Sequence, residues 1–248
     1  MIIALFVLLI LAGGFTFWSH LEIVSAARNG NLAMVKSLVK IFPNLASSKD
    51  KYGVTPLHWA AEYDHKEIVS FLLANKADVD ARDVEGQTPL NYAAQYDEEL
   101  SHKDVAELLL ANKADPNARD ADGRTPLHEA AYYDHRDVAE LLLASNAGVN
   151  ARDDENETPL FWTTITGDTD VAKLLLTNKA DINAKDNEGE TPLYEAAYLG
   201  DTNMVNFLLI NGADVNATNK DGYTPLKEAI FVGNEGVAEV LRQHGGHE

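Results

Sequence analysis

TPLHEAA, at residues Thr125–Ala131, is the stretch that decides the fold, because its first three residues recur along the chain. The intervals between successive copies are 33, 37, 33, 33 and 33 residues, and the copies begin at Thr55, Thr88, Thr125, Thr158, Thr191 and Thr224. A period of this length indicates a stack of similar units rather than one globular core. We therefore expect an array that works by offering a long surface to a partner.

The unit that begins at Asp120 predicts one tight turn followed by two short helices. Asp120 and Gly123 bound the turn, in which glycine supplies a backbone conformation that other residues resist. Thr125 is placed to cap the first helix, and Pro126 occupies its first position, where no hydrogen-bond donor is lost. The second helix has apolar residues at helical spacing, namely Val138, Leu141 and Leu142. Such a unit buries its apolar face only against its neighbours.

At these positions the chain resembles the ankyrin repeat family. The resemblance covers Leu21 to the C-terminus and rests on TPLHWAA (Thr55–Ala61), TPLHEAA, and the linkers ADVDA (Ala77–Ala81), ADPNA (Ala114–Ala118), ADINA (Ala180–Ala184) and ADVNA (Ala213–Ala217). It implies an all-α solenoid of helix-turn-helix repeats with β-hairpin-like turns. It also implies that the hairpin tips and first helices line a concave groove that binds proteins.

We predict about seven units within residues 19–248. Their boundaries are 19–49, 50–82, 83–119, 120–152, 153–185, 186–218 and 219–248. The first unit lacks Thr-Pro-Leu, and the last has Arg242 where the preceding unit has Leu209. Both departures are typical of terminal repeats, whose outer faces are polar.

Residues 1–18 differ from everything that follows, because Ile2–Trp18 carries no charge. As a helix this stretch would span about 26 Å, which is marginal against a hydrocarbon core of roughly 30 Å. It predicts either a transmembrane anchor or a signal peptide cleaved near Ala12-Gly13-Gly14. The expected location is therefore membrane-anchored through the N-terminus or, after cleavage, exported to the periplasm or secreted.

The charge of the chain restricts its partners. The formal net charge is −19, from 39 acidic and 20 basic side chains. Phosphate backbones repel such a surface, so we expect no nucleic acid, and membrane contact only through residues 1–18. A basic protein or peptide is the favoured partner. The alternative is that the acidic charge only keeps the array soluble. We expect a monomer.

No arrangement of residues predicts an enzyme, a cofactor or a metal site. The sequence has no cysteine, no glycine-rich phosphate loop and no nucleophile–base pair. His58 and His128 follow Thr-Pro-Leu directly and could be ligands. The family resemblance implies instead that they bond backbone groups of adjacent units.

In each repeat, the two residues that follow the paired small residues differ from one copy to the next. In the family's geometry these two residues point into the groove. Tyrosine gives a large, rigid, amphipathic contact there. With acidic hairpin tips, these positions give the predicted partner-binding residues: Tyr63, Tyr96, Tyr132, Tyr133, Tyr198, Phe231, Glu85, Asp122, Glu155 and Glu188. The alternative is that the tyrosines stack on one another and stabilise the array.

The predicted function is a non-enzymatic protein–protein interaction module. It would bind a protein or peptide, expected to be basic, along a concave, tyrosine-rich and acid-rimmed face. The alternative is an immunity or antitoxin-like protein that inhibits a basic enzyme. Strong acidity fits both hypotheses.

Three departures from the consensus carry further expectations. Four extra residues are placed at Glu98–Ser101, between the helices of the third unit. In the fifth unit, Asn156 replaces the turn glycine, and Thr163-Thr164 replace the paired alanines, which predicts the weakest interior interface. Where the sixth unit has Gly212, four others have Lys76, Lys113, Asn146 and Lys179. A left-handed backbone there would cost each lysine about 1 kcal/mol relative to glycine.

Overall fold

The computed structural model describes residues 15–95, 102–167 and 169–248, with side chains from Leu21 onward. These residues form 14 α-helices and one 3₁₀ helix, and none of them forms a strand, which confirms the predicted all-α fold. The chain divides into two compact units, one ending at Ala121 and the other beginning at Asp122.

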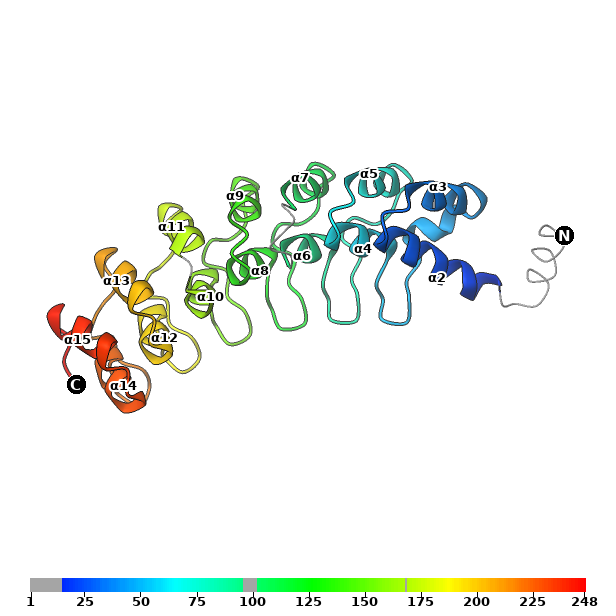
Figure 1. The fold of residues 1–248 in the computed structure, drawn as a ribbon. Helices are drawn as coiled ribbons and strands as arrows, with labels where there is room; N and C mark the ends of the chain where they lie inside the picture. The colour runs from blue at the N-terminus through cyan, green and yellow to red at the C-terminus, as the bar shows by residue number, and fades with distance from the viewer. Residues whose placement is uncertain (1–14, 96–101, 168) are drawn as a thin grey trace. The chain divides into compact units, whose positions relative to one another are not determined.

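The first unit stacks three helix pairs (Figure 1). The inner helices, from which the hairpin loops project, lie in one row, and the outer helices form a second row. The inner helices are α2 (Phe15–Arg28), α4 (Pro56–Glu62) and α6 (Pro89–Ala94), and the outer ones are α3 (Leu32–Ile41), α5 (Lys66–Ala74) and α7 (Lys103–Ala111). A 3₁₀ helix, η1 (Pro43–Ser47), follows α3.

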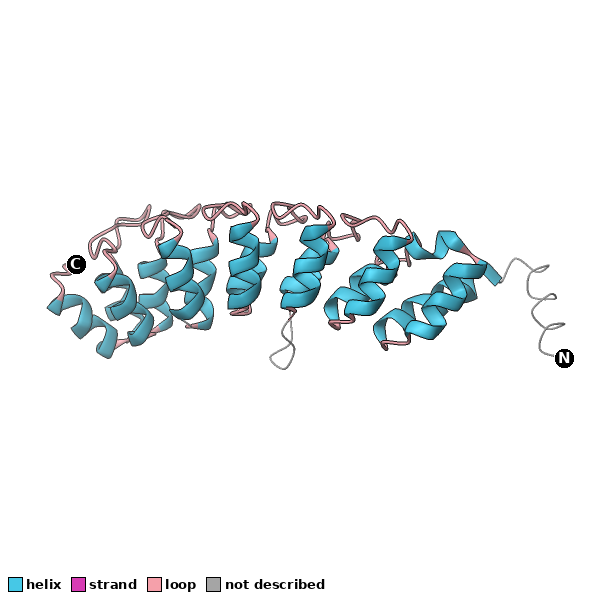
Figure 2. Ribbon diagram, turned by 90° about the horizontal axis from the view of Figure 1, so that it is seen from above, coloured by secondary structure: helices cyan, strands magenta, loops and turns pink. Residues whose placement is uncertain are grey.

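The second unit repeats this arrangement with four pairs. Its inner helices are α8 (Pro126–Tyr132), α10 (Pro159–Thr166), α12 (Pro192–Leu199) and α14 (Pro225–Val232). Its outer helices are α9 (Arg136–Ala144), α11 (Thr169–Thr177), α13 (Thr202–Ile210) and α15 (Glu235–Gln243). Figure 2 shows that in each unit the long loops gather along one edge of the helix pairs, and short connections join the helices at the other edge.

Five hairpins are held by the aspartate or asparagine that begins the repeat, at residues 50, 83, 153, 186 and 219. In the sixth repeat, Asp186 Oδ1 accepts the backbone N–H groups of Glu188 and Glu190, both at 2.8 Å. Neighbouring tips are joined by one backbone hydrogen bond, for example from Asn187 N–H to Glu155 O at 2.8 Å. These bonds satisfy backbone groups that a helix or sheet would otherwise satisfy.

The core of each unit comes from the leucine of Thr-Pro-Leu and the paired small residues after it. Leu57, Leu90, Leu127, Leu160 and Leu193 are all 0% exposed. Small residues let neighbouring inner helices approach closely, so the stacked repeats bury a continuous apolar layer.

The fifth repeat satisfies its buried threonines inside α10. Thr163 Oγ1 donates to Leu160 O and Thr164 Oγ1 donates to Phe161 O, both at 2.7 Å. The hydroxyl groups therefore find partners, as buried polar groups must. The weak interface expected at this repeat stays a prediction, for which hydrogen exchange is the measurement.

The lysines that lie two residues after the outer helices adopt the left-handed conformation that the sequence suggests. The φ angles are 64° at Lys76, 71° at Lys113 and 70° at Lys179, and Asn146 has φ 65°. Asn156 in the fifth turn also has a positive φ, 60°. Only glycine adopts this region without a steric cost, so the lysines are a source of strain.

Replacing Lys113 or Lys179 by glycine is expected to raise the free energy of unfolding by about 1 kcal/mol each, because glycine relieves the left-handed strain. Gly212 occupies the equivalent position at φ 95°, and a Cβ added there meets no atom within 4 Å. Gly212→Lys is therefore the matched control and is expected to lose a similar amount. Chemical denaturation measures both, and a loss of stability in Lys113→Gly would contradict the strain argument.

Three of the sequence predictions fall partly or wholly outside the described residues. They are the membrane-directing or signal segment at residues 1–18, the insertion at Glu98–Ser101, and Tyr96. Within the described ranges, no helix has the length and apolar character needed to cross a membrane.

Candidate functional site

The predicted binding residues at the ends of the inner helices differ sharply in how much of each side chain is exposed to solvent. Tyr63, at the end of α4, is half-buried beneath a cation of its own chain. The Arg28 guanidinium lies 5.3 Å from the centroid of Tyr63 and 4.8 Å from that of Trp59. Arg28 also donates to Tyr63 Oη, from Nη2 at 2.9 Å and from Nε at 3.2 Å. Tyr63 therefore ties α4 to α2.

Tyr132 and Tyr133, at the end of α8, are also half-buried by neighbouring rings. The Tyr132 ring meets Tyr133 edge-on at 4.9 Å and the Trp162 ring of the next repeat at 5.4 Å, both between centroids. Tyr133 stacks on His135 at 6.3 Å. In this part of the second unit, the alternative expectation of internal stacking describes the tyrosines well.

The last three inner helices end differently, in exposed apolar side chains that we call the C-terminal strip. Its members and exposed fractions are Ile165 (43%), Tyr198 (50%), Leu199 (46%), Phe231 (77%) and Val232 (37%). They lie on α10, α12 and α14, and these helices pack side by side in that order. The strip therefore crosses three successive repeats as one surface. Large exposed apolar patches on proteins are typical of interaction sites, which makes the C-terminal strip a candidate.

The four acidic residues predicted at hairpin tips, Glu85, Asp122, Glu155 and Glu188, are all exposed. Glu155 and Glu188 lie on adjoining hairpins of the second unit, in the repeats that carry Ile165 and Tyr198. Asp122 lies at the start of that unit, 3.7 Å from the Arg124 guanidinium. Glu85 belongs to the first unit. The structure thus brings together only part of the predicted set.

A second group of carboxylates, which we call the carboxylate row, lies between the tips and the C-terminal strip: Glu157, Glu190 and Glu195. Burial raises the pKa of Glu157 to about 7, helped by the neighbouring charges of Asp153 and Asp186. Burial and the charges of Glu190 and Asp186 also raise the pKa of Glu195. Among the described residues, no basic side chain forms an ion pair with Glu157 or Glu195.

The sequence prediction missed Glu195 and Glu228, which occupy the position of Trp59 in the second repeat. Glu195 precedes Tyr198 and Leu199 by three and four residues on α12, so all three share one helix face. Glu228 is only 8% exposed and accepts from Tyr194 Oη at 2.7 Å. The signal was an acidic residue at a position that is aromatic in other repeats.

The histidines that follow Thr-Pro-Leu are structural, as the family resemblance implied. His58 Nδ1 accepts the Thr55 N–H at 3.1 Å, and Nε2 lies 3.1 Å from Gln87 O of the next repeat, so Nε2 carries the proton. Burial lowers the pKa of His58, which keeps the ring neutral. His128 makes the same pair of contacts, with Thr125 at 3.0 Å and with Glu157 O at 3.3 Å.

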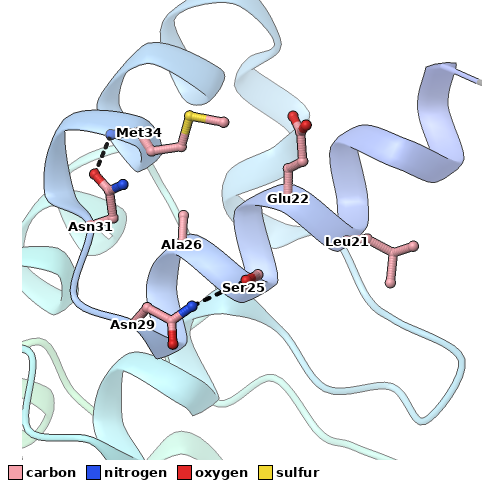
Figure 3. A pocket seen from close by; sticks show the side chains of 7 residues that line it. All are labelled: Leu21, Glu22, Ser25, Ala26, Asn29, Asn31 and Met34. Atoms are coloured by element: carbon pink, nitrogen blue, oxygen red, sulfur yellow. Dashed lines mark hydrogen bonds between the residues drawn. The ribbon is translucent and has the colours of Figure 1, made fainter.

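A shallow hollow at the outer side of α2 and α3 is a weaker candidate (Figure 3). It is lined by Leu21, Glu22, Ser25, Ala26, Asn29, Asn31 and Met34. Three of its polar side chains are already engaged, because Asn29 Nδ2 donates to Ser25 Oγ at 3.2 Å and Asn31 Oδ1 accepts the Met34 N–H at 3.1 Å. Among the described residues, no group of three or more His, Cys, Asp or Glu could hold a metal ion.

Comparison with protein families gives a match over nearly the whole described chain. The family model of ankyrin repeats (three copies) matches residues 23–120, 85–153, 100–186, 145–219 and 185–248. These overlapping matches follow from the repeat period itself, because the model can align at successive repeats of the chain.

Two curated proteins of Arabidopsis thaliana are similar over a shorter stretch. E3 ubiquitin-protein ligase XBAT33 is 45% identical over 62 residues, which is 25% of this chain and 12% of that protein. E3 ubiquitin-protein ligase XBAT32 is 41% identical over 63 residues, again 25% of this chain and 12% of that protein. The matched stretch therefore spans only about an eighth of either relative.

Proposed function

The chain belongs to the ankyrin repeat family and is a protein–protein interaction module, and we propose that it binds its partner on the C-terminal strip. The observation that carries this proposal is the exposure of five apolar side chains on three adjoining inner helices. Tyr198 and Phe231 are the expected anchors, since large aromatic side chains at the centre of an interface contribute most of the binding energy.

The partner that fits this surface is a basic, amphipathic protein segment. Its apolar side would cover Tyr198, Leu199 and Phe231, while its lysines or arginines would face the carboxylate row and the tips at Glu155 and Glu188. Burial of apolar area supplies the affinity, and charge complementarity speeds encounter and selects the partner. The ligase activity of the two plant relatives is not carried over, because the similarity covers so little of their length.

Site-specific crosslinking tests this proposal. A photoreactive phenylalanine analogue placed at Tyr198 is expected to crosslink a basic protein from a native lysate. The same analogue at Tyr52, which is 55% exposed on a first-unit hairpin, is the matched control and should not crosslink it. Equal crosslinking from both positions would contradict a specific strip. The identity of the captured protein then decides between a scaffold and an inhibitor of a basic enzyme.

The location and the oligomeric state remain proposals from the sequence. We propose that residues 1–18 direct the chain to a membrane or to export, and that the protein acts as a monomer. The intact mass of the mature protein distinguishes a retained anchor from a cleaved signal, because cleavage near Gly14 removes a fixed mass.

A further inference from the structure

The carboxylate row and the C-terminal strip form one continuous face. Glu195 lies one helical turn before Tyr198 and Leu199 on α12. Glu157 and Glu190 end the hairpins directly before Thr158 and Thr191, the N-cap residues of α10 and α12. The charge of Glu195 acts on Glu157 and that of Glu190 acts on Glu195, so the three carboxylates are neighbours, and a segment that covers the strip and reaches Glu195 lies close to all of them.

The groups that face the carboxylate row are almost all acidic or already in contact with another group of the protein. The carboxylates that act on Glu157 come from its own hairpin, the next hairpin and α12: Asp153, Glu155, Asp186 and Glu195. From the preceding repeat, the His128 ring bonds the backbone oxygen of Glu157. Arg124 lies 4.4 Å from the Trp162 ring centroid and 3.7 Å from Asp122.

The groups toward the C-terminus follow the same rule. Glu190 accepts from Asn219 Nδ2 at 3.3 Å, and Glu228 is held by Tyr194. Lys227, the basic side chain of α14, lies 3.8 Å from the Tyr223 ring centroid. Half-buried carboxylates in such surroundings repel one another unless they bind protons or meet cations supplied from outside.

Resting on the proposed function, we propose that binding on this face is an exchange of protons for partner cations. Glu157 of the carboxylate row holds a proton for part of the time in the free protein, and a bound lysine- or arginine-rich segment displaces it. The partner is therefore held tightly in neutral or mildly basic solution and is released by mild acid.

The sign of the exchange follows from linkage. Glu157, with its pKa raised to about 7, is partly protonated in the free protein near neutral pH. A nearby cation favours the ionised form and lowers the pKa of Glu157 in the complex. Binding near pH 7 then releases protons, and affinity falls as the pH drops below the pKa of the free protein.

The test uses a synthetic amphipathic helix of leucine and lysine, whose lysines stay charged throughout. Calorimetry in two buffers of different ionisation enthalpy is expected to show release of about half a proton near pH 7, because Glu157 is about half protonated in the free protein when the pH equals its pKa. The dissociation constant is expected to rise about tenfold between about pH 8 and about pH 5.5. Glu157→Gln, which keeps the shape of the side chain, should remove most of this pH dependence while the peptide still binds.

A peptide with glutamate in place of lysine is the matched control and should bind weakly at each pH. If the lysine peptide binds through the strip with no proton release and a flat pH profile, the exchange is wrong and the proposed function stands. If binding is unaffected by loss of Tyr198 and Phe231, or is absent, the proposed function fails and the exchange fails with it. Carbon NMR of the Glu157 carboxyl in the unchanged protein, with and without peptide, gives the same answer independently of any variant.

Discussion

A protein in which Tyr198 and Phe231 are both replaced by alanine is expected to bind the leucine–lysine peptide at least about 100-fold more weakly than the unchanged chain. Truncation of a central aromatic anchor costs about 2 kcal/mol or more, and each 1.4 kcal/mol is about a factor of ten in affinity. Both side chains are at least half exposed, at 50% and 77%, so the stability of the fold should hardly change. Isothermal titration and thermal denaturation of the same samples measure the two quantities.

The chain offers a matched control for this prediction. Ile210, at the end of the outer helix α13, is 78% exposed, almost the same as Phe231 at 77%, but it lies outside the C-terminal strip. Ile210→Ala should leave peptide affinity unchanged. Tyr63→Ala should show the opposite pattern, since it removes the contacts with Arg28 and so lowers stability without weakening binding. Equal losses of affinity in all these variants would mean that the strip is not the site.

The largest expected loss of stability comes from Asp83→Ala, about 2–4 kcal/mol, because this side chain accepts three hydrogen bonds. Oδ1 accepts the backbone N–H groups of Glu85 and Gln87, both at 2.9 Å, and Oδ2 accepts from Tyr92 Oη at 2.9 Å. Alanine leaves these donors without their acceptor, and the hairpin loses the hydrogen bonds that fix its conformation. Chemical denaturation followed by circular dichroism measures the loss.

Asp83→Asn distinguishes the hairpin bonds from the bond to Tyr92. Asn219 already occupies the equivalent position in the last repeat and accepts the N–H groups of Asp221 and Tyr223 at 3.0 and 2.9 Å. Asparagine at residue 83 should therefore keep two of the three bonds and cost less than half as much as alanine. If the two variants were equally destabilised, the backbone bonds would not be the source of the stability.

Much of the fold could be predicted from the sequence, because it depends on local chemistry that repeats. Thr125, Pro126 and the paired alanines each act within one turn of helix, and the strained backbone at Lys113 follows from its alignment with Gly212. The role of His58 also follows from its fixed place after Thr-Pro-Leu. Such features need no knowledge of distant parts of the chain.

The candidate site was harder to predict, because the availability of a ring depends on residues far away in sequence. Tyr63 and Leu199 occupy the same repeat position, but Tyr63 is covered by Arg28, which lies 35 residues earlier in the degenerate first repeat. Trp162 likewise covers Tyr132 from the next repeat. The pKa of Glu157 is raised by burial and by carboxylates of two repeats. This combination cannot be read from the sequence of any single repeat.

Hydrogen–deuterium exchange of the whole chain with the leucine–lysine peptide tests the location of the binding surface most directly. Protection on binding is expected at the C-terminal ends of α10, α12 and α14 and at the hairpins that carry Glu157 and Glu190. The inner helices α4 and α6 of the first unit should exchange at unchanged rates. Protection centred on α4 around Tyr63, with none on α12 and α14, would contradict the assignment of the C-terminal strip as the binding surface.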